Sequence, residues 1–229
     1  MNVFIGVKYC VGFIILVASV TSFASLTINL TDANGNAVPN AVISIANKLN
    51  PHDSDAEFPT AIMDQIDYQF VPKVLIVNKD QKVDFPNSDD VRHHVYSFSQ
   101  PNAFEIKMYQ GSDAKPIDFR QQGIVVLDCN IHDSMIGYIY VADNEHAYLS
   151  DASGQVLIPQ DVLEQSSDDT ININVWHPQL SSTHVKRVMH SIDRTKTDIS
   201  ISLSMYQHTP VSEHNMPAND DSKFNRGMK

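Results

Sequence analysis

The chain has 229 residues and 42% hydrophobic residues, enough to bury the core of one large domain or two small ones. Its formal net charge of −11 at pH 7 argues against nucleic acids and anionic membrane surfaces as partners, because both repel an acidic protein. The acidic residues are dispersed along the sequence, which is typical of a soluble, self-repelling surface.

Residues 1–24 have the pattern of a secretory signal peptide. Lys8 supplies a positive charge, an apolar run follows over residues 9–20, and Ser22 and Ala24 form a small-residue cleavage site. The apolar run is too short to span a bilayer comfortably, and no later segment is long enough to try. The sequence therefore predicts an exported, periplasmic protein without a membrane span, cleaved near Ala24.

Cleavage would leave a single cysteine in the mature chain. Cys10 lies inside the apolar run of the signal, so Cys129 would remain alone and without a disulfide partner in the same chain. Two roles then remain for Cys129. It is either a buried, inert side chain of the core or a chemically active thiol, and its neighbours in the sequence decide between them.

Short strands dominate the rest of the sequence, and turn residues separate them at short, regular intervals. Some segments, such as ININV at 171–175, alternate apolar and polar residues as half-buried strands do. Helix is expected only as a short turn within 159–165. The expected strands span residues 26–30, 41–45, 73–77, 82–85, 94–98, 104–109, 123–127, 137–141, 147–149, 155–158, 170–176 and 197–205. The sequence thus predicts an all-β fold, a sandwich or a barrel.

The strands form three sets, and the first set is too small to build a core of its own. The first and third sets share a D-A-x-G turn, at residues 32–35 and 151–154. We therefore favour one flanking β-sandwich made from both sets, with the middle set inserted between them, over three domains in a row. The expected organisation is a signal peptide at 1–24, the first part of the flanking sandwich at 25–58, a central β domain at 59–143, the second part of the flanking sandwich at 144–206 and a disordered polar tail at 207–229.

The strongest functional signal is the string C-N-I-H-D-S-M, which places Cys129, His132 and Met135 in one loop between two expected strands. A fourth candidate ligand, His93, follows Asn87 on the way into a neighbouring strand. A thiolate, two imidazoles and a thioether form a soft to borderline ligand set that selects copper over magnesium or calcium. Zinc also accepts one cysteine and two histidines, but it gains little from a thioether.

The choice between His93 and the adjacent His94 depends on strand geometry. Neighbouring residues of a strand face opposite sides of the sheet, so only one of the two can point at a metal. The alternation of His93 with Val91 and Val95 favours His93, and His94 stays the alternative ligand. The predicted site therefore consists of His93, Cys129, His132 and Met135, and it holds one copper ion per chain.

These motifs resemble those of the cupredoxins, the family of plastocyanin and amicyanin. In that family a V-x-F strand leads to the first histidine ligand, as Val83 and Phe85 do here, and a short C-x2-H-x2-M loop supplies the other ligands. The strings HHVYSFS and CNIHD resemble more closely the cupredoxin-like proteins labelled methylamine utilization proteins. The flanks, with V-W-H-P at 175–178, resemble carboxypeptidase regulatory-like modules. The resemblance covers residues 60–142 and implies a Greek-key sandwich.

The resemblance implies a type 1 (blue) copper protein that carries single electrons and is not an enzyme. It also implies a redox partner that docks on an apolar patch around His132, and the acidic surface suits a basic partner such as a c-type cytochrome. The alternative is a periplasmic copper-binding or copper-sensing protein without electron transfer, in which the flanking sandwich is an interaction module. Two positions depart from the family pattern: His94 replaces an asparagine, and Ser134 replaces a bulky residue of the loop.

Overall fold

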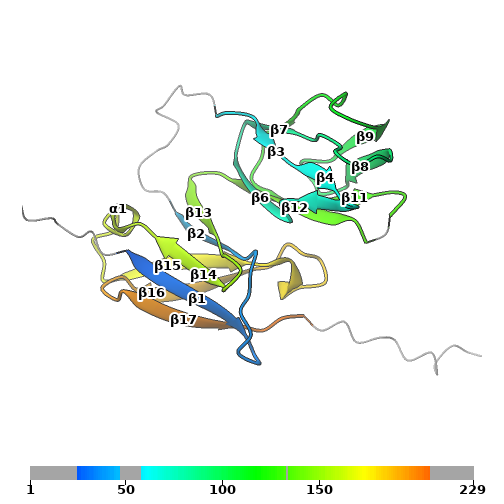
Figure 1. Ribbon diagram of the computed structural model, residues 1–229. Helices are drawn as coiled ribbons and strands as arrows, with labels where there is room; N and C mark the ends of the chain where they lie inside the picture. The colour runs from blue at the N-terminus through cyan, green and yellow to red at the C-terminus, as the bar shows by residue number, and fades with distance from the viewer. Residues whose placement is uncertain (1–24, 47–57, 133, 207–229) are drawn as a thin grey trace, which may run out of the picture.

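The computed structural model describes residues 25–46, 58–132 and 134–206 (Figure 1). Within these ranges strands predominate, and the helical elements are helix α1 (Gln160–Leu163) and a 3-10 turn at Pro178–Leu180. The predicted all-β fold class, with a second β-sandwich beside the central one, is confirmed.

Two predicted segments, the signal peptide at 1–24 and the tail at 207–229, lie outside the described residues, so both stay predictions. Among the helices that the structure does describe, none has the length and apolar composition needed to cross a membrane.

The central lobe comprises the described residues from 58 to 142 and contains ten strands in the upper part of Figure 1. One sheet has the order β10-β7-β3 and the other the order β6-β12-β11-β8-β9, while β4 and β5 form a separate hairpin. The strands are β3 (Ala61–Ile62), β4 (Asp64–Ile66), β5 (Gln69–Val71), β6 (Val74–Asn78), β7 (Gln81–Asp84), β8 (His93–Ser97), β9 (Phe104–Tyr109), β10 (Ile117–Phe119), β11 (Gly123–Cys129) and β12 (Ile136–Ala142).

The core of the central lobe forms where the inward faces of these strands meet. Its fully buried members include Phe85, Val95, Phe119, Leu127 and Ile139, which come from five different parts of the lobe. On β8 burial alternates strictly along the strand, as the two-residue period of a half-buried strand requires. This alternation turns one of the two adjacent histidines of β8 inward and the other outward.

The flanking lobe, formed by residues 25–46 and 145–206, is a sandwich of two sheets with orders β14-β1-β17 and β13-β2-β15-β16. Each sheet combines a strand from before the central lobe with strands from after it, and β1 pairs in parallel with β17. Its strands are β1 (Leu26–Asp32), β2 (Val42–Ala46), β13 (Glu145–Leu149), β14 (Gln155–Ile158), β15 (Thr170–Trp176), β16 (Arg187–Asp193) and β17 (Asp198–Leu203).

The two D-A-x-G turns of the flanking lobe have the same construction. In the first turn the Asp32 carboxylate accepts hydrogen bonds from the backbone N–H groups of Asn34 and Asn36, both at 2.8 Å. In the second, Asp151 accepts from the corresponding N–H groups two and four residues further on, at 2.8 and 2.9 Å. Aspartate is favoured in such turns because its short side chain replaces a backbone acceptor.

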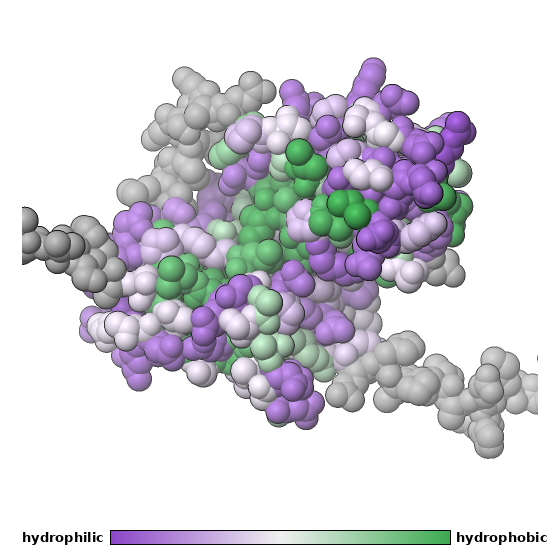
Figure 2. Space-filling view, in the orientation of Figure 1, coloured by the Kyte–Doolittle hydropathy of each residue, from purple (hydrophilic) through white to green (hydrophobic). Residues whose placement is uncertain are grey.

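The two lobes share a third hydrophobic cluster, which lies at their junction. Tyr138 and Tyr140 of β12 pack against Trp176 of β15, with ring centroids 5.7 and 6.0 Å apart. The Tyr140 hydroxyl lies 3.0 Å from both Ser44 Oγ and Glu145 Oε1, so the buried polar groups at the junction are satisfied. Figure 2 shows apolar surface where the lobes meet. The flanking lobe therefore covers the outer face of the sheet that contains β11 and β12.

The β4–β5 hairpin packs closely against β12 at Gly137. A Cβ atom at position 137 would lie 2.7 Å from Cβ and 2.9 Å from Cγ of Phe70, which is closer than side chains pack. Phe70 itself is only 1% exposed, so it has no free space to move into. Glycine at position 137 thus allows the hairpin to lie beside the loop that leads into β12.

We expect Gly137→Ala to destabilise the protein by about 1–3 kcal/mol, because the added methyl group must displace the buried Phe70 ring. Urea unfolding followed by tyrosine and tryptophan fluorescence measures the change. A midpoint equal to that of the unmodified protein would contradict the close packing described here.

Candidate metal centre

Backbone pairing between β8 and β11 brings the first two candidate ligands together. In this antiparallel pair Cys129 lies opposite Val95, and His93 is two residues before Val95 on the same face of β8. His93 is completely buried and Cys129 is 4% exposed. The sheet itself therefore places an imidazole and a thiol side by side at one end of the central core.

His132 comes from the loop that joins β11 to β12, and the loop folds back onto the strand that precedes it. Its backbone N–H donates to the carbonyl of Cys129 at 3.4 Å, and its own carbonyl accepts from the N–H of Met135 at 2.9 Å. These two successive turns bring the His132 ring to within 5.1 Å of the His93 ring, measured between centroids.

The ligand atoms of His93, Cys129 and His132 converge. Cys129 Sγ lies 3.7 Å from Nδ1 of His93 and 3.7 Å from Nδ1 of His132, and all three atoms lie within 4.8 Å of one another. A thiol has one proton and can donate it to only one of these nitrogens at a time. The sulfur can also accept an N–H from an imidazole, so the roles of donor and acceptor in this cluster depend on the histidine tautomers.

A metal ion at this point fits the distances. One sulfur at about 2.3 Å and one nitrogen at about 2.0 Å from a shared metal lie about 3.5 to 3.7 Å apart for tetrahedral to trigonal angles. Both observed separations are 3.7 Å. The three residues thus offer one sulfur and two imidazoles at separations that a shared metal ion can bridge, and this donor set occurs in copper electron-transfer proteins.

Met135 is the least defined of the four predicted ligands. Its side chain is 1% exposed and belongs to the same buried cluster as Cys129. Its position two residues before Gly137 places it where the loop enters β12. The structure therefore puts Met135 inside the core beside the cluster, and thioether coordination stays a prediction.

His94 lies on the opposite face of β8, as the alternation of the strand requires. Its Nε2 atom is 2.9 Å from Glu105 Oε1 on β9, and its ring contacts Tyr96. His94 is not part of the cluster of ligand atoms that the described residues form.

Asp89 is a further residue of the candidate site that the ligand motif alone does not reveal. Its Oδ2 atom lies 2.7 Å from Nε2 of His93, so the imidazole that offers Nδ1 to a metal donates its other N–H to a carboxylate. Burial raises the pKa of Asp89, but hydrogen bonds from His93 and from two backbone N–H groups outweigh burial and lower it overall. The charged carboxylate fixes the tautomer and the orientation of the His93 ring.

Asn87 shapes the segment that carries Asp89. Its side-chain amide donates to the carbonyls of Val91 and Tyr109 at 2.9 and 3.0 Å, and its Oδ1 accepts from the Asp89 N–H at 3.1 Å. This explains physically why an asparagine precedes His93 by six residues, since it closes the turn that leads into β8.

Tyr68, at the tip of the β4–β5 hairpin, is a second residue that sequence reasoning missed. Its ring stands edge-on to both imidazoles, with centroids 4.8 Å from His132 and 5.9 Å from His93. A carboxylate four residues before a ligand histidine is a visible signal for Asp89, but no local pattern marks Tyr68, because the contact arises from folding.

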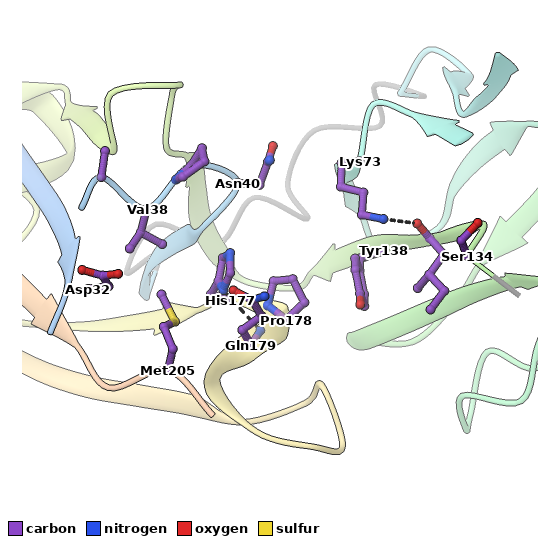
Figure 3. A pocket seen from close by; sticks show the side chains of 13 residues that line it. Asp32, Val38, Asn40, Lys73, Ser134, Tyr138, His177, Pro178, Gln179 and Met205 are labelled. Carbon is purple, nitrogen blue, oxygen red and sulfur yellow. Dashed lines mark hydrogen bonds between the residues drawn. The ribbon is translucent and has the colours of Figure 1, made fainter. Parts of the chain in front are cut away.

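A cleft of about 430 Å³ between the lobes reaches the end of the loop between β11 and β12 (Figure 3). Ser134, Lys73 and Ile136 line the cleft, and Lys73 Nζ donates to the backbone carbonyl of Ile136 at 2.5 Å. His177 faces the cleft from the flanking lobe, but its Nδ1 accepts from the Gln179 N–H at 3.2 Å and burial lowers its pKa. His177 therefore has a structural role at the turn after β15.

A scan against protein-family models finds no match, and a search of curated proteins finds none. Several solved structures are similar to part of the chain. A copper-containing nitrite reductase (NirK) from Thermus scotoductus SA-01 is 25% identical over 38% of this chain and 23% of its own, with a TM-score of 0.36. This chain thus matches about a quarter of that protein's length.

Two smaller proteins match over nearly their whole length. A purple cupredoxin from Nitrosopumilus maritimus is 19% identical over 36% of this chain and 99% of its own, with a TM-score of 0.33. A reduced, Cu(I) form of an amicyanin mutant is 19% identical over 45% of this chain and 99% of its own, with a TM-score of 0.34. What speaks for a metal centre is the arrangement of this chain's own ligand atoms.

We expect Asp89→Ala to weaken Cu(I) binding by about 10- to 100-fold, because the His93 ring loses the carboxylate that orients it. Competition with a chromophoric Cu(I) chelator measures the affinity. Asp90→Ala is the matched control, since it removes the same charge from the exposed neighbouring residue. Equal affinities of the two variants would show that Asp89 acts only through its charge.

Proposed function

We propose that the chain is an exported type 1 copper protein of the cupredoxin family that carries single electrons. The observation that carries the proposal is the pair of equal 3.7 Å separations from Cys129 Sγ to the two imidazole Nδ1 atoms. Met135 is proposed as the weak fourth ligand. Bound copper would supply a one-electron couple, and a ligand set of this kind suits both of its oxidation states.

The chain's own residues hold the ligands in place and limit solvent access. His93 and Cys129 are buried in the core, and the β8–β11 pairing and Asp89 fix their positions before any metal binds. Preorganised ligands move little when an electron arrives or leaves, and this small rearrangement favours fast transfer.

His132 is the ligand through which we propose that electrons enter and leave. His132 is partly exposed, and its neighbour Ile131 is 46% exposed. Tyr68, whose ring contacts the His132 ring, is also 46% exposed. Exposed apolar side chains beside a redox centre suit a short-lived contact with a partner protein. The net charge of −11 favours a basic partner, for which a c-type cytochrome is our proposal.

The alternative function is copper holding or sensing without electron transfer. It is motivated by the flanking lobe, whose two sheets add a complete second sandwich that contributes no residue to the ligand cluster found among the described residues. In this alternative the flanking lobe binds a partner. The likeness of its sequence to carboxypeptidase regulatory-like modules, and of the central lobe to methylamine utilization proteins, stays a prediction.

We expect the protein with Cu(II) to show an intense visible band from charge transfer between the Cys129 sulfur and copper. Cys129→Ser should abolish the band, because a hydroxyl does not donate charge to Cu(II) as a thiolate does. His94→Ala should keep it, since His94 faces away from the ligand cluster. A serine variant that keeps the band, or an H94A variant that loses it, would refute this ligand assignment.

Stopped-flow mixing with a reduced basic c-type cytochrome separates the two functions. A carrier should be reduced rapidly, and raising the salt concentration should slow the reaction, because screening weakens attraction between an acidic and a basic protein. A holding or sensing protein should keep its Cu(II) spectrum on the same timescale. Slow reduction that does not depend on salt would favour the alternative function.

A further inference from the structure

The turn of the β4–β5 hairpin has a strained backbone. Its two central residues, Asp67 and Tyr68, have φ angles of 51° and 60°. Two-residue hairpin turns with positive φ at both positions are usually built from asparagine, aspartate and glycine. A bulky tyrosine in this conformation is a genuine outlier, and such strain persists only where the surrounding structure holds it. The strain therefore indicates that the tyrosine side chain has a role that glycine could not fill.

Asp89 binds both the backbone of this turn and the candidate ligand His93. Asp89 accepts the backbone N–H of Asp67 at 2.7 Å with Oδ1 and that of Tyr68 at 3.1 Å with Oδ2. The same Oδ2 atom lies 2.7 Å from Nε2 of His93. One partly buried carboxylate thus ties the tip of the hairpin to the imidazole, and charge-assisted hydrogen bonds make this tie strong.

The rest of the hairpin is fixed to the lobe on two sides. On β4 the Gln65 N–H donates to the Pro86 carbonyl at 3.1 Å, and the Gln65 carbonyl accepts from the Ser88 N–H at 3.0 Å. On β5 the ring of Phe70 is buried over Gly137. The position of Tyr68 is therefore determined by the fold and is not that of a free loop tip.

The Tyr68 ring lies at the boundary between the ligands and solvent. It contacts both imidazoles edge-on, at 4.8 and 5.9 Å between centroids, while 46% of the residue is exposed. Beneath the imidazoles, Cys129 is 4% exposed. We propose that the Tyr68 ring covers the His132 imidazole and keeps small molecules away from the sulfur of Cys129. This proposal rests on the copper site proposed above.

The proposal differs from a purely structural role of Tyr68 in the turn. If Tyr68 served only the turn, Tyr68→Gly would raise the melting temperature, because glycine adopts positive φ without strain, and it would leave the accessibility of Cys129 unchanged. If the ring also covers the site, the same variant should keep a melting temperature no lower than that of the unmodified protein, and Cys129 should become accessible to reagents in solution. Tyr68→Phe keeps the ring, so it should behave as the unmodified protein does.

The test measures how fast iodoacetamide alkylates Cys129 in the metal-free protein, by mass spectrometry of the peptide that contains this residue. We expect Tyr68→Gly to raise the rate by about tenfold or more, because the reactivity of a thiol follows its access to solvent. Tyr68→Phe should stay within about twofold of the unmodified protein. Asn144→Gly is the control, since it relieves a positive φ of 54° in the turn between β12 and β13 without touching the site.

A second measurement uses the copper-loaded protein. Azide should alter the visible spectrum of Tyr68→Gly at concentrations that leave the unmodified protein and Tyr68→Phe unchanged. Tyr68→Asn gives a second ring-free variant that also tolerates positive φ, so a loss of stability specific to glycine does not prevent the test. Alkylation rates in both ring-free variants equal to the unmodified rate would overturn the proposal.

The two proposals can fail separately. Alkylation rates that separate as expected, in a protein that shows no charge-transfer band with Cu(II), would support the role of Tyr68 and refute the copper assignment. A strong band with equal alkylation rates would refute the role of Tyr68 alone.

Discussion

The register between β8 and β11 is the constraint on which the candidate metal centre depends. It places Cys129 opposite Val95. His93 lies two residues before Val95 and faces the same side of the sheet, so its imidazole lies beside the Cys129 sulfur. A shift of one residue would turn His94 inward and move His93 to the outer face. The loop that carries His132 can complete the cluster only after this pairing is correct. The distance between Cys129 and His93 is thus a property of the sheet, which is among the more rigid places to put a ligand, whereas His132 comes from the loop.

The flanking lobe bears on the site through the outer face of that same sheet. Tyr138 and Tyr140 alternate with inward-facing core residues of β12, so this strand has a buried partner on both sides. A strand packed on both faces resists bending, and the loop between β11 and β12 begins and ends on such strands. Arg187 of β16 adds a cation–π contact between the lobes, with its Cζ atom 4.6 Å from the centroid of the Tyr140 ring.

Much of this structure could be predicted from local sequence signals. Strands with clear alternation, such as β15, have the expected bounds, and the Cys129–His132 spacing marks the loop. The hairpin of β4 and β5 gave no such signal, because its strands have three residues each and its turn lacks glycine and asparagine. Asp89 lies four residues before His93, and that spacing is visible in the sequence. The bonds from the Asp67–Tyr68 turn to Asp89, and the contacts of Tyr68 with the two histidines, join segments about 20 or more residues apart, and only the folded chain shows them.

The parallel pairing of β1 with β17 has a consequence for how the chain folds. Asn29 and Asp198 hydrogen-bond across a separation of 169 residues, so the flanking lobe cannot be completed until nearly all of the chain is available. The central lobe is continuous in sequence, and its closing contacts span much shorter loops, which cost less entropy to form. We therefore expect folding in two stages during synthesis, in which the central lobe forms first and the later strands then complete the flanking lobe by pairing with β1 and β2.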